Sequence, residues 1–305
     1  MRIVFMGTPE FAVASLDELI QSGSDIVGVV TAPDKPAGRG QQINESAVKK
    51  YAVANGLKVL QPIKLKDEQF LNELKALKAD LQVVVAFRML PEVVWDMPRL
   101  GTINLHASLL PQYRGAAPIN WVLINGEKES GVTTFFLKQE IDTGDILFTE
   151  KVTLTGHETA GDLHDRLMAK GAGLLVKTVK AVESGRYTEN PQEHLTEGME
   201  LKHAPKIFKE DCNINWDQPA EKIYNFIRGL SPYPTAYTTL NDKILKVFGA
   251  EYEPADPSEQ PGEFFSDNRT FLKVSATDGF VHLTDVQLEG KKRMGIQEFL
   301  RGVRL

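Results

Sequence analysis

Cysteine is almost absent from this chain of 305 residues, in which Cys212 has no second cysteine to pair with. An internal disulfide is therefore excluded, and this cysteine usage fits a protein of the reducing cytoplasm. Cys212 follows Asp211 in a polar stretch and has no obvious base beside it. We therefore expect no nucleophilic role for its thiol.

Long apolar runs are also missing. No run approaches the roughly 20 residues that a membrane helix needs, and 42% hydrophobic with 25% charged residues is typical of a soluble globular protein. The apolar part of residues 1–7 is short and is followed at once by Thr8-Pro9-Glu10, unlike a secretory signal. The sequence thus predicts a cytoplasmic protein without membrane contact.

Two cofactor signatures are lacking. A dinucleotide-binding turn would carry G-x-G-x-x-G after the first strand, where only Gly7 is present, and this argues against hydride transfer. No histidine and cysteine cluster has the spacing of a zinc site, so we expect no metal.

The net charge of −6 means that any nucleic acid would be held by local patches rather than by the overall field.

The length predicts two domains. A strand at Ile3 to Met6, a turn, a helical pattern from Phe11 to Ile20 and a buried strand at Ile26 to Val30 form a βαβ opening. Residues Leu81 to Phe87 are a continuous apolar run, typical of a central parallel strand. The fold class that we predict for residues 1–189 is therefore α/β, a doubly wound and mostly parallel sheet of the Rossmann-like kind.

The predicted secondary structure changes towards the end of the chain. Glycines and a proline in a polar stretch after Ser184 indicate a linker, which we place at 190–203. Beyond it, short β-prone segments with frequent turns predict a small β-barrel over 204–305. An OB-like barrel is one member of that class, and it binds nucleic acid.

One strand carries two functional side chains on one face. In Thr102 to His106 polar and apolar residues alternate, so Asn104 and His106 point the same way. An imidazole can accept or deliver a proton near neutral pH, and an amide can donate to a carbonyl oxygen that gains charge. These are two parts of an acyl-transfer site, although a polar strand end with a hydrogen-bonded histidine is the alternative.

Three further features accompany this strand. Asp142 lies in the turn Asp142-Thr143-Gly144-Asp145, where an aspartate is also an ordinary turn residue. Residues 31–42 contain prolines, glycines, Lys35 and Arg39 without apolar periodicity, which predicts an exposed loop. The last fifteen residues carry five basic side chains against one acidic one, either a nucleic-acid patch or ordinary surface. The five are Lys291, Lys292, Arg293, Arg301 and Arg304.

Together these motifs resemble those of the folate-dependent formyltransferase family, and within it the methionyl-tRNA formyltransferases. The matching segments run in register along the whole chain. They are Met6 to Ala12, Pro33 to Gly40, Asn104 to Pro111, Tyr113 to Pro118, Asp142 to Asp145 and Leu230 to Pro234. The block around Asn104 indicates only the chemistry, whereas the Arg39 loop and the carboxy-terminal part point to tRNA.

The resemblance implies transfer of a formyl group from 10-formyltetrahydrofolate to the α-amino group of methionine on initiator methionyl-tRNA, with no metal. The catalytic triad would be Asn104, His106 and Asp142. The first two would stabilise a tetrahedral oxyanion, and Asp142 would hold the imidazole and help to take the amine proton, directly or through water. The net charge and a length that suffices for two domains lead us to expect a monomer.

The resemblance also implies where the co-substrates bind. The folate-binding residues would be Phe87, Arg88, Met89, Leu90, Ser108, Leu109, Leu110 and Pro111. The chain has Phe87 and Arg88 where the family usually has tyrosine and glycine, so the pterin contacts there are expected to differ. The tRNA-binding residues would be Lys35, Arg39 and the five basic residues near the end.

Two rival functions use the same residues. A folate-dependent transferase acting on an amino sugar or another small amine would share the triad but would not need the Arg39 loop or the basic end. A tRNA-binding or folate-binding module without turnover would need His106 only as a structural residue. A formyl-transfer assay with charged initiator tRNA distinguishes the three.

Overall fold

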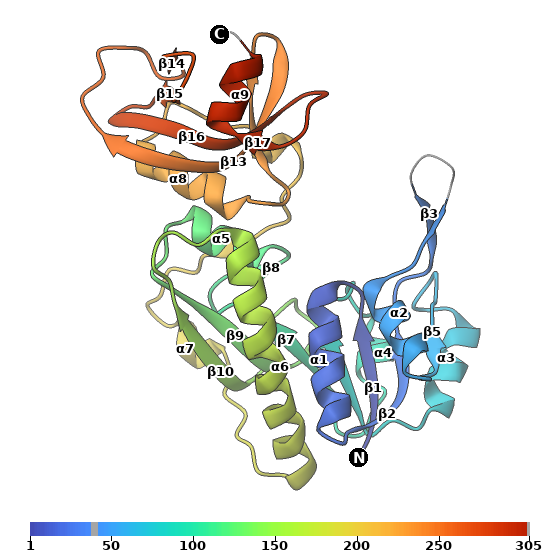
Figure 1. The fold of residues 1–305 in the computed structure, drawn as a ribbon. Coiled ribbons are helices and arrows are strands. Elements are labelled where there is room, and N and C mark those ends of the chain that lie inside the picture. The colour runs from blue at the N-terminus through green and yellow to red at the C-terminus, as the bar shows by residue number, and fades with distance from the viewer. Residues whose placement is uncertain (38–41, 304–305) are drawn as a thin grey trace. The chain divides into compact units, whose positions relative to one another are not determined.

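The computed structural model describes residues 1–37 and 42–303. Two compact units are present, and each is built from separate pieces of the chain (Figure 1). Unit 1 comprises Met1–Arg114, Gly131–Val152 and Asp165–Lys202, and unit 2 comprises Gly115–Ser130, Thr153–His164 and His203–Leu305. The predicted boundary at 190–203 stays a prediction.

Unit 1 is organised around a mostly parallel sheet with the order β10-β9-β7-β6-β1-β2-β5. Its strands are β1 (Arg2–Gly7), β2 (Asp25–Val30), β5 (Val59–Leu60), β6 (Leu81–Val85), β7 (Thr102–His106), β9 (Glu129–Phe136) and β10 (Ile146–Thr153). β1 pairs in parallel with both β2 and β6, β6 pairs in parallel with β7, and β9 runs antiparallel to β7. The strand order reverses between β1 and β6, which is where such sheets place ligands, at the carboxyl ends of their strands.

Helices cover this sheet. They are α1 (Glu10–Gln21), α2 (Ala47–Ala54), α3 (Glu68–Ala76), α4 (Glu92–Trp95), α6 (Ala160–Ser184) and α7 (Glu193–Thr196). Asp67 caps α3 by accepting hydrogen bonds from the backbone amides of Gln69 and Phe70. Phe70 and Leu74 then pack into the apolar cluster on the sheet, where burial of each side chain stabilises the fold by about 1.5–3 kcal/mol. The short β3 (Lys35–Ala37) and β4 (Gln42–Asn44) pair outside the main sheet.

Unit 2 is organised around an antiparallel sheet with the order β12-β13-β16-β15-β14, and β17 pairs with β16. Its elements are α5 (Pro118–Ile124), a 3₁₀ turn (Glu210–Cys212), α8 (Ala220–Gly229), β12 (Ala236–Leu240), β13 (Lys243–Pro254), β14 (Phe264–Ser266), β15 (Leu272–Ser275), β16 (Gly279–Leu288), β17 (Met294–Gly295) and α9 (Ile296–Gly302). Two further short strands, β8 (Arg114–Gly115) and β11 (His203–Ala204), pair with each other.

A bulge makes the sheet of unit 2 curl. The register of β13 against β16 shifts on both sides of Gly249, and such bulges bend and twist a strand. A Cβ on Gly249 would lie 2.7 Å from Oγ1 of Thr284, so only glycine fits there without a shift of that side chain. α8 buries Ile223 and Ile227 in the core that this sheet encloses. The predicted fold class, a Rossmann-like unit and an antiparallel barrel-like unit, is confirmed.

Candidate active site

The predicted catalytic strand is β7, and its polar face lies at the carboxyl end of the sheet. Side chains alternate along a strand, so Asn104 and His106 share a face while Leu105 points to the other. Leu105 lies where a Cβ added to Gly171 of α6 would be 2.8 Å away, which places that helix on the opposite face. His106 is buried and Asn104 half-buried. Both predicted side chains are thus held by regular structure.

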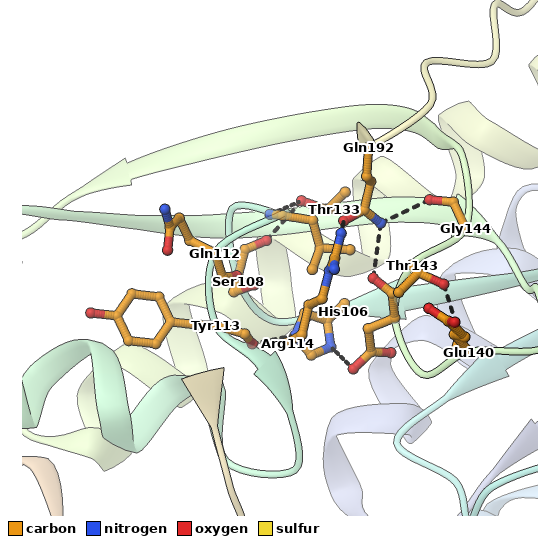
Figure 2. A network of polar contacts seen from close by, with 12 residues as sticks. His106, Ser108, Gln112, Tyr113, Arg114, Thr133, Glu140, Thr143, Gly144 and Gln192 are labelled. Carbon is orange, nitrogen blue, oxygen red and sulfur yellow. Dashed lines mark hydrogen bonds and ion pairs between the residues drawn. The ribbon is translucent and has the colours of Figure 1, made fainter. Parts of the chain in front are cut away.

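His106 is fixed through both of its ring nitrogens (Figure 2). Its Nε2 lies 2.8 Å from the carbonyl oxygen of Tyr113, and its Nδ1 lies 3.7 Å from a carboxylate oxygen of Asp142. A carbonyl oxygen only accepts hydrogen bonds, so Nε2 carries a proton. Nδ1 faces the Asp142 carboxylate, so the ring is held in one orientation between a carbonyl oxygen and a carboxylate.

The loop after β7 is held by a hydroxyl of the neighbouring strand. Thr133, which pairs with His106 across β7 and β9, donates through Oγ1 to the Ser108 carbonyl at 2.7 Å and accepts from the Leu110 amide at 3.2 Å. Ser108 itself donates to the Gln112 carbonyl at 2.7 Å. These bonds keep the segment 108–111, which was predicted to bind folate, directly beside the imidazole.

The second predicted folate segment, 87–90, begins where β6 ends. It leaves the strand through Ala86, whose φ of 47° is a left-handed value that turns the backbone away from the sheet. Arg88 donates to the Ile63 carbonyl at 2.9 Å and to the Pro62 carbonyl, and its guanidinium carbon lies 5.6 Å from the centroid of the Phe87 ring. Burial lowers the pKa of Arg88. Met89 is exposed and Leu90 is buried. Because β6 and β7 are parallel neighbours, both predicted folate segments lie at one edge of the sheet.

The turn that carries Asp142 depends on a residue that the sequence did not indicate. Gln192 donates through Nε2 to the carbonyl oxygens of Asp142, at 2.9 Å, and Gly144, at 2.8 Å. Its Oε1 accepts from Nε and Nη2 of Arg114, at 3.0 and 2.7 Å (Figure 2). Burial lowers the pKa of Arg114, although Asp142 acts in the other direction. Gln192 falls in the segment predicted as a linker, where nothing in the composition distinguishes it.

The turn has no room for a side chain at position 144. A Cβ there would lie 1.6 Å from the carbonyl oxygen of Phe136, far inside any tolerated contact. Asp145, on the other side, pairs with Lys138 at 2.8 Å. The turn therefore packs closely against the end of β9 and aims Asp142 at His106.

Comparison with known proteins identifies the family. The formyl transferase model matches residues 1–179, and the model of the formyl transferase C-terminal domain matches residues 206–304. A methionyl-tRNA formyltransferase of Bacteroides fragilis is 53% identical over 310 residues, covering 100% of this chain and 96% of that protein. One of Parabacteroides distasonis is 55% identical over 309 residues, covering 99% and 95%.

The chain belongs to the methionyl-tRNA formyltransferase family. The resemblance noticed in the sequence is thereby confirmed. Solved structures share the fold at lower identity. An N-formyltransferase of Helicobacter canadensis in complex with folinic acid and dTDP-3-aminofucose has a TM-score of 0.64 at 20% identity, covering 94% of this chain and 98% of that one. HypX of Aquifex aeolicus in complex with tetrahydrofolic acid has a TM-score of 0.66 at 19% identity, covering 99% and 48%.

The residues predicted to contact tRNA differ in their exposure and in their partners within the protein. Lys35 is exposed on β3, whereas Arg39 and Arg304 lie outside the described residues. Lys291, Lys292 and Arg301 are exposed in unit 2. Arg293 pairs with Asp285 at 2.6 Å, which raises the pKa of the guanidinium, and its guanidinium carbon lies 4.2 Å from the centroid of the Phe248 ring. Arg293 is thus engaged within the protein.

Neither a metal-binding cluster nor a membrane-spanning helix is found in the part of the chain that the structure describes. Residues 1–37 and 42–303 contain no group of three or more His, Cys, Asp or Glu side chains that could hold a metal ion. None of the helices in that part of the chain combines the length and hydropathy needed to cross a membrane.

Proposed function

We propose that this protein transfers the formyl group of 10-formyltetrahydrofolate to the α-amino group of methionine on initiator methionyl-tRNA, in the cytoplasm and as a monomer. Membership of the methionyl-tRNA formyltransferase family supports the reaction. The observation that carries the mechanism is the buried contact of His106 with Asp142 at 3.7 Å, at the edge of the sheet where both predicted folate segments begin.

Asn104 and His106 act on the carbonyl oxygen of the formyl group. Attack by the methionine amine turns that oxygen into an oxyanion, which the Asn104 amide and the imidazolium stabilise by donating hydrogen bonds. The Nε2 proton of His106 is donated to the neutral carbonyl of Tyr113 before reaction. An anionic oxygen is the stronger acceptor, so it attracts this proton as the charge develops.

Asp142 has two tasks. Its carboxylate stabilises the imidazolium of His106, and it receives the proton that the attacking amine loses, directly or through a water molecule. The tetrahedral centre then collapses to the formylated amine by breaking its bond to the folate nitrogen, which takes up the proton that Asp142 received. Formyl transfer is complete without a covalent bond to the protein.

The residues beside the triad suit a flat heteroaromatic donor. Leu110, Phe135 and Ile146 form a buried apolar cluster next to the loop after β7, and the backbone after β6 supplies carbonyl and amide groups at the same edge of the sheet. A pterin ring needs apolar faces together with polar groups at its rim. We assign Phe87 to Leu90 and Ser108 to Pro111 to this task.

The tRNA is held in this proposal by basic side chains from two parts of the chain. Lys35 and Arg39 would reach the acceptor end, and Lys291, Lys292 and Arg301 would contact phosphates. Because the net charge is −6, such local patches must provide the attraction. Arg293 contributes less, since it is paired with Asp285.

A single-turnover assay tests the proposal. The protein is mixed with 10-formyltetrahydrofolate labelled in the formyl group and with charged initiator tRNA, and label on the methionine amine is followed over time. We expect rapid transfer to initiator methionyl-tRNA and none to a nucleotide-linked amino sugar. Transfer to the amino sugar alone would assign the rival substrate, and binding of both co-substrates without transfer would assign a module without turnover.

A further inference from the structure

Gln192 is a buried amide whose hydrogen-bonding atoms are all engaged within unit 1. The residue is 1% exposed. An amide offers two N–H donors and one carbonyl oxygen with two lone pairs. Here both donors reach the turn at Asp142 and Gly144, and the oxygen accepts twice from Arg114. Such complete satisfaction fixes the side chain in one orientation, because any other would leave buried polar atoms unpaired.

The two segments that Gln192 joins are those that hold the His106–Asp142 pair. Arg114 directly follows Tyr113, whose carbonyl accepts from Nε2 of His106. On the other side, the bonds from Gln192 end on the backbone of Asp142 itself (Figure 2). The Gln192 side chain therefore links the segment of Tyr113, whose carbonyl orients the imidazole, to Asp142, whose carboxylate faces it.

Both segments need such support because their backbones are strained. Tyr113 has φ of 60° and Asp142 has φ of 54°, in the left-handed region that residues other than glycine adopt at a cost. Strained backbone persists only where surrounding contacts hold it. Without the amide of Gln192, the carbonyl oxygens of Asp142 and Gly144 would lose a donor, and the turn would relax away from His106.

We propose that Gln192 is a positioning residue that sets the distance between Nδ1 of His106 and the carboxylate of Asp142. The inference rests on the proposed function, in which that distance decides how well the imidazolium is stabilised. A misplacement of about 1 Å can cost about 10²-fold in rate. Gln192 does not touch the reacting atoms in this view, so its loss should lower kcat and leave the KM values nearly unchanged.

Two substitutions test this role from different sides. Gln192→Glu keeps an acceptor for Arg114 but removes both donors to the turn. Gln192→Asn keeps the amide and shortens its reach by one methylene. Gln69→Glu is the matched control, because Gln69 is exposed on α3 and its side chain donates to Glu73 on the same helix. We expect a fall in kcat of about 30- to 100-fold for both Gln192 variants, KM values within about threefold, and no change for the control.

A double-mutant cycle shows whether Gln192 acts through Asp142. In the Asp142→Asn background, Gln192→Glu should cost less than about threefold, because contacts that act through one group are not additive. An equal loss in both backgrounds would overturn the proposal, as would near-normal kcat in both folded variants. Unfolding of both variants, seen by circular dichroism, would assign a purely structural role and would overturn it too.

The wild-type assay separates the two levels of the argument. If the wild-type protein transfers no formyl group to any amine tested, the proposed function is wrong. If it is active and Gln192→Glu matches it, the function stands and the positioning role is wrong.

Discussion

Replacing Asp142 by asparagine removes one charge from the catalytic pair and keeps its shape. The asparagine amide can still approach Nδ1 of His106, and the backbone bonds from Gln192 to residues 142 and 144 do not involve the changed atoms. Folding should therefore be retained. The chemical effect is that the imidazolium loses its counter-charge while the neutral imidazole gains a donor at Nδ1.

The size of the effect follows from the distance. Two unit charges 3.7 Å apart attract each other by about 4.5 kcal/mol at an effective dielectric constant of about 20, and by about 1.1 kcal/mol in bulk water. These energies correspond to factors of about 10³ and about sevenfold in rate. The pair is largely buried, with side chains 7% and 11% exposed. We therefore expect kcat to fall by about 10²- to 10³-fold.

The assay is single-turnover formyl transfer at saturating co-substrates, with circular dichroism as a check of the fold. Asp145→Asn is the control, because it makes the same change in the same turn but removes a partner of Lys138 rather than of His106. It should leave kcat within about twofold. If Asp142→Asn lost less than the sevenfold expected in bulk water, or if Asp145→Asn lost as much, the role assigned to Asp142 would be refuted.

Three other outcomes are expected. His106→Ala should lower kcat by about 10²- to 10⁴-fold with an intact fold, and near-normal turnover would contradict the mechanism. Lys291→Gln with Lys292→Gln should weaken tRNA binding and reduce the slope of log affinity against log salt by about 0.9 per lost phosphate contact, so an unchanged slope would remove both residues from the interface. Although burial raises it, hydrogen bonds from backbone amides, that of Thr155 foremost, lower the pKa of Glu158 from 4.5 to about 2. A carboxyl group whose pKa is lowered in the folded state stabilises that state at pH values above its ordinary pKa of 4.5. This contribution to stability should therefore be lost as the pH falls from 4.5 towards 2. Glu158→Gln should cost about 1–2 kcal/mol in the free energy of unfolding at neutral pH, measured by urea denaturation, and make this part of the acid dependence disappear.

Much of the local structure was determined by the sequence itself. The alternation in Thr102 to His106 predicted both the strand and its polar face, because side-chain direction in a strand has a period of two. Proline favours the first turn of a helix because it has no amide to leave unpaired there. Pro118 before Ile119 to Ile124 therefore predicts a helix start, and α5 begins at Pro118. The sequence also predicts a helix from Ala220 to Gly229, and α8 has these bounds.

Element lengths were predicted less well where pairing rather than hydrophobicity decides them. The β-prone residues Leu245 to Phe248 predict a short strand, whereas β13 extends over Lys243–Pro254, because residues 250–254 are held by their partners on β16 rather than by apolar side chains. Val132 to Leu137 predict a strand that starts later than β9, which begins at Glu129. A strand continues as long as a neighbour supplies hydrogen bonds, and a single sequence does not reveal that neighbour.

The sequence determined which residue types carry the chemistry, and the tertiary structure decided how they are held together. His106 and Asp142 stand out because a histidine on a polar strand face and an aspartate in a glycine turn are chemically recognisable. Gln192 does not, because a glutamine in a polar stretch has no local pattern, and its role appears only when segments 50 and 78 residues away in the chain meet it. Local periodicity records which face a residue points to. Hydrogen bonds between distant segments are recorded only in the folded chain.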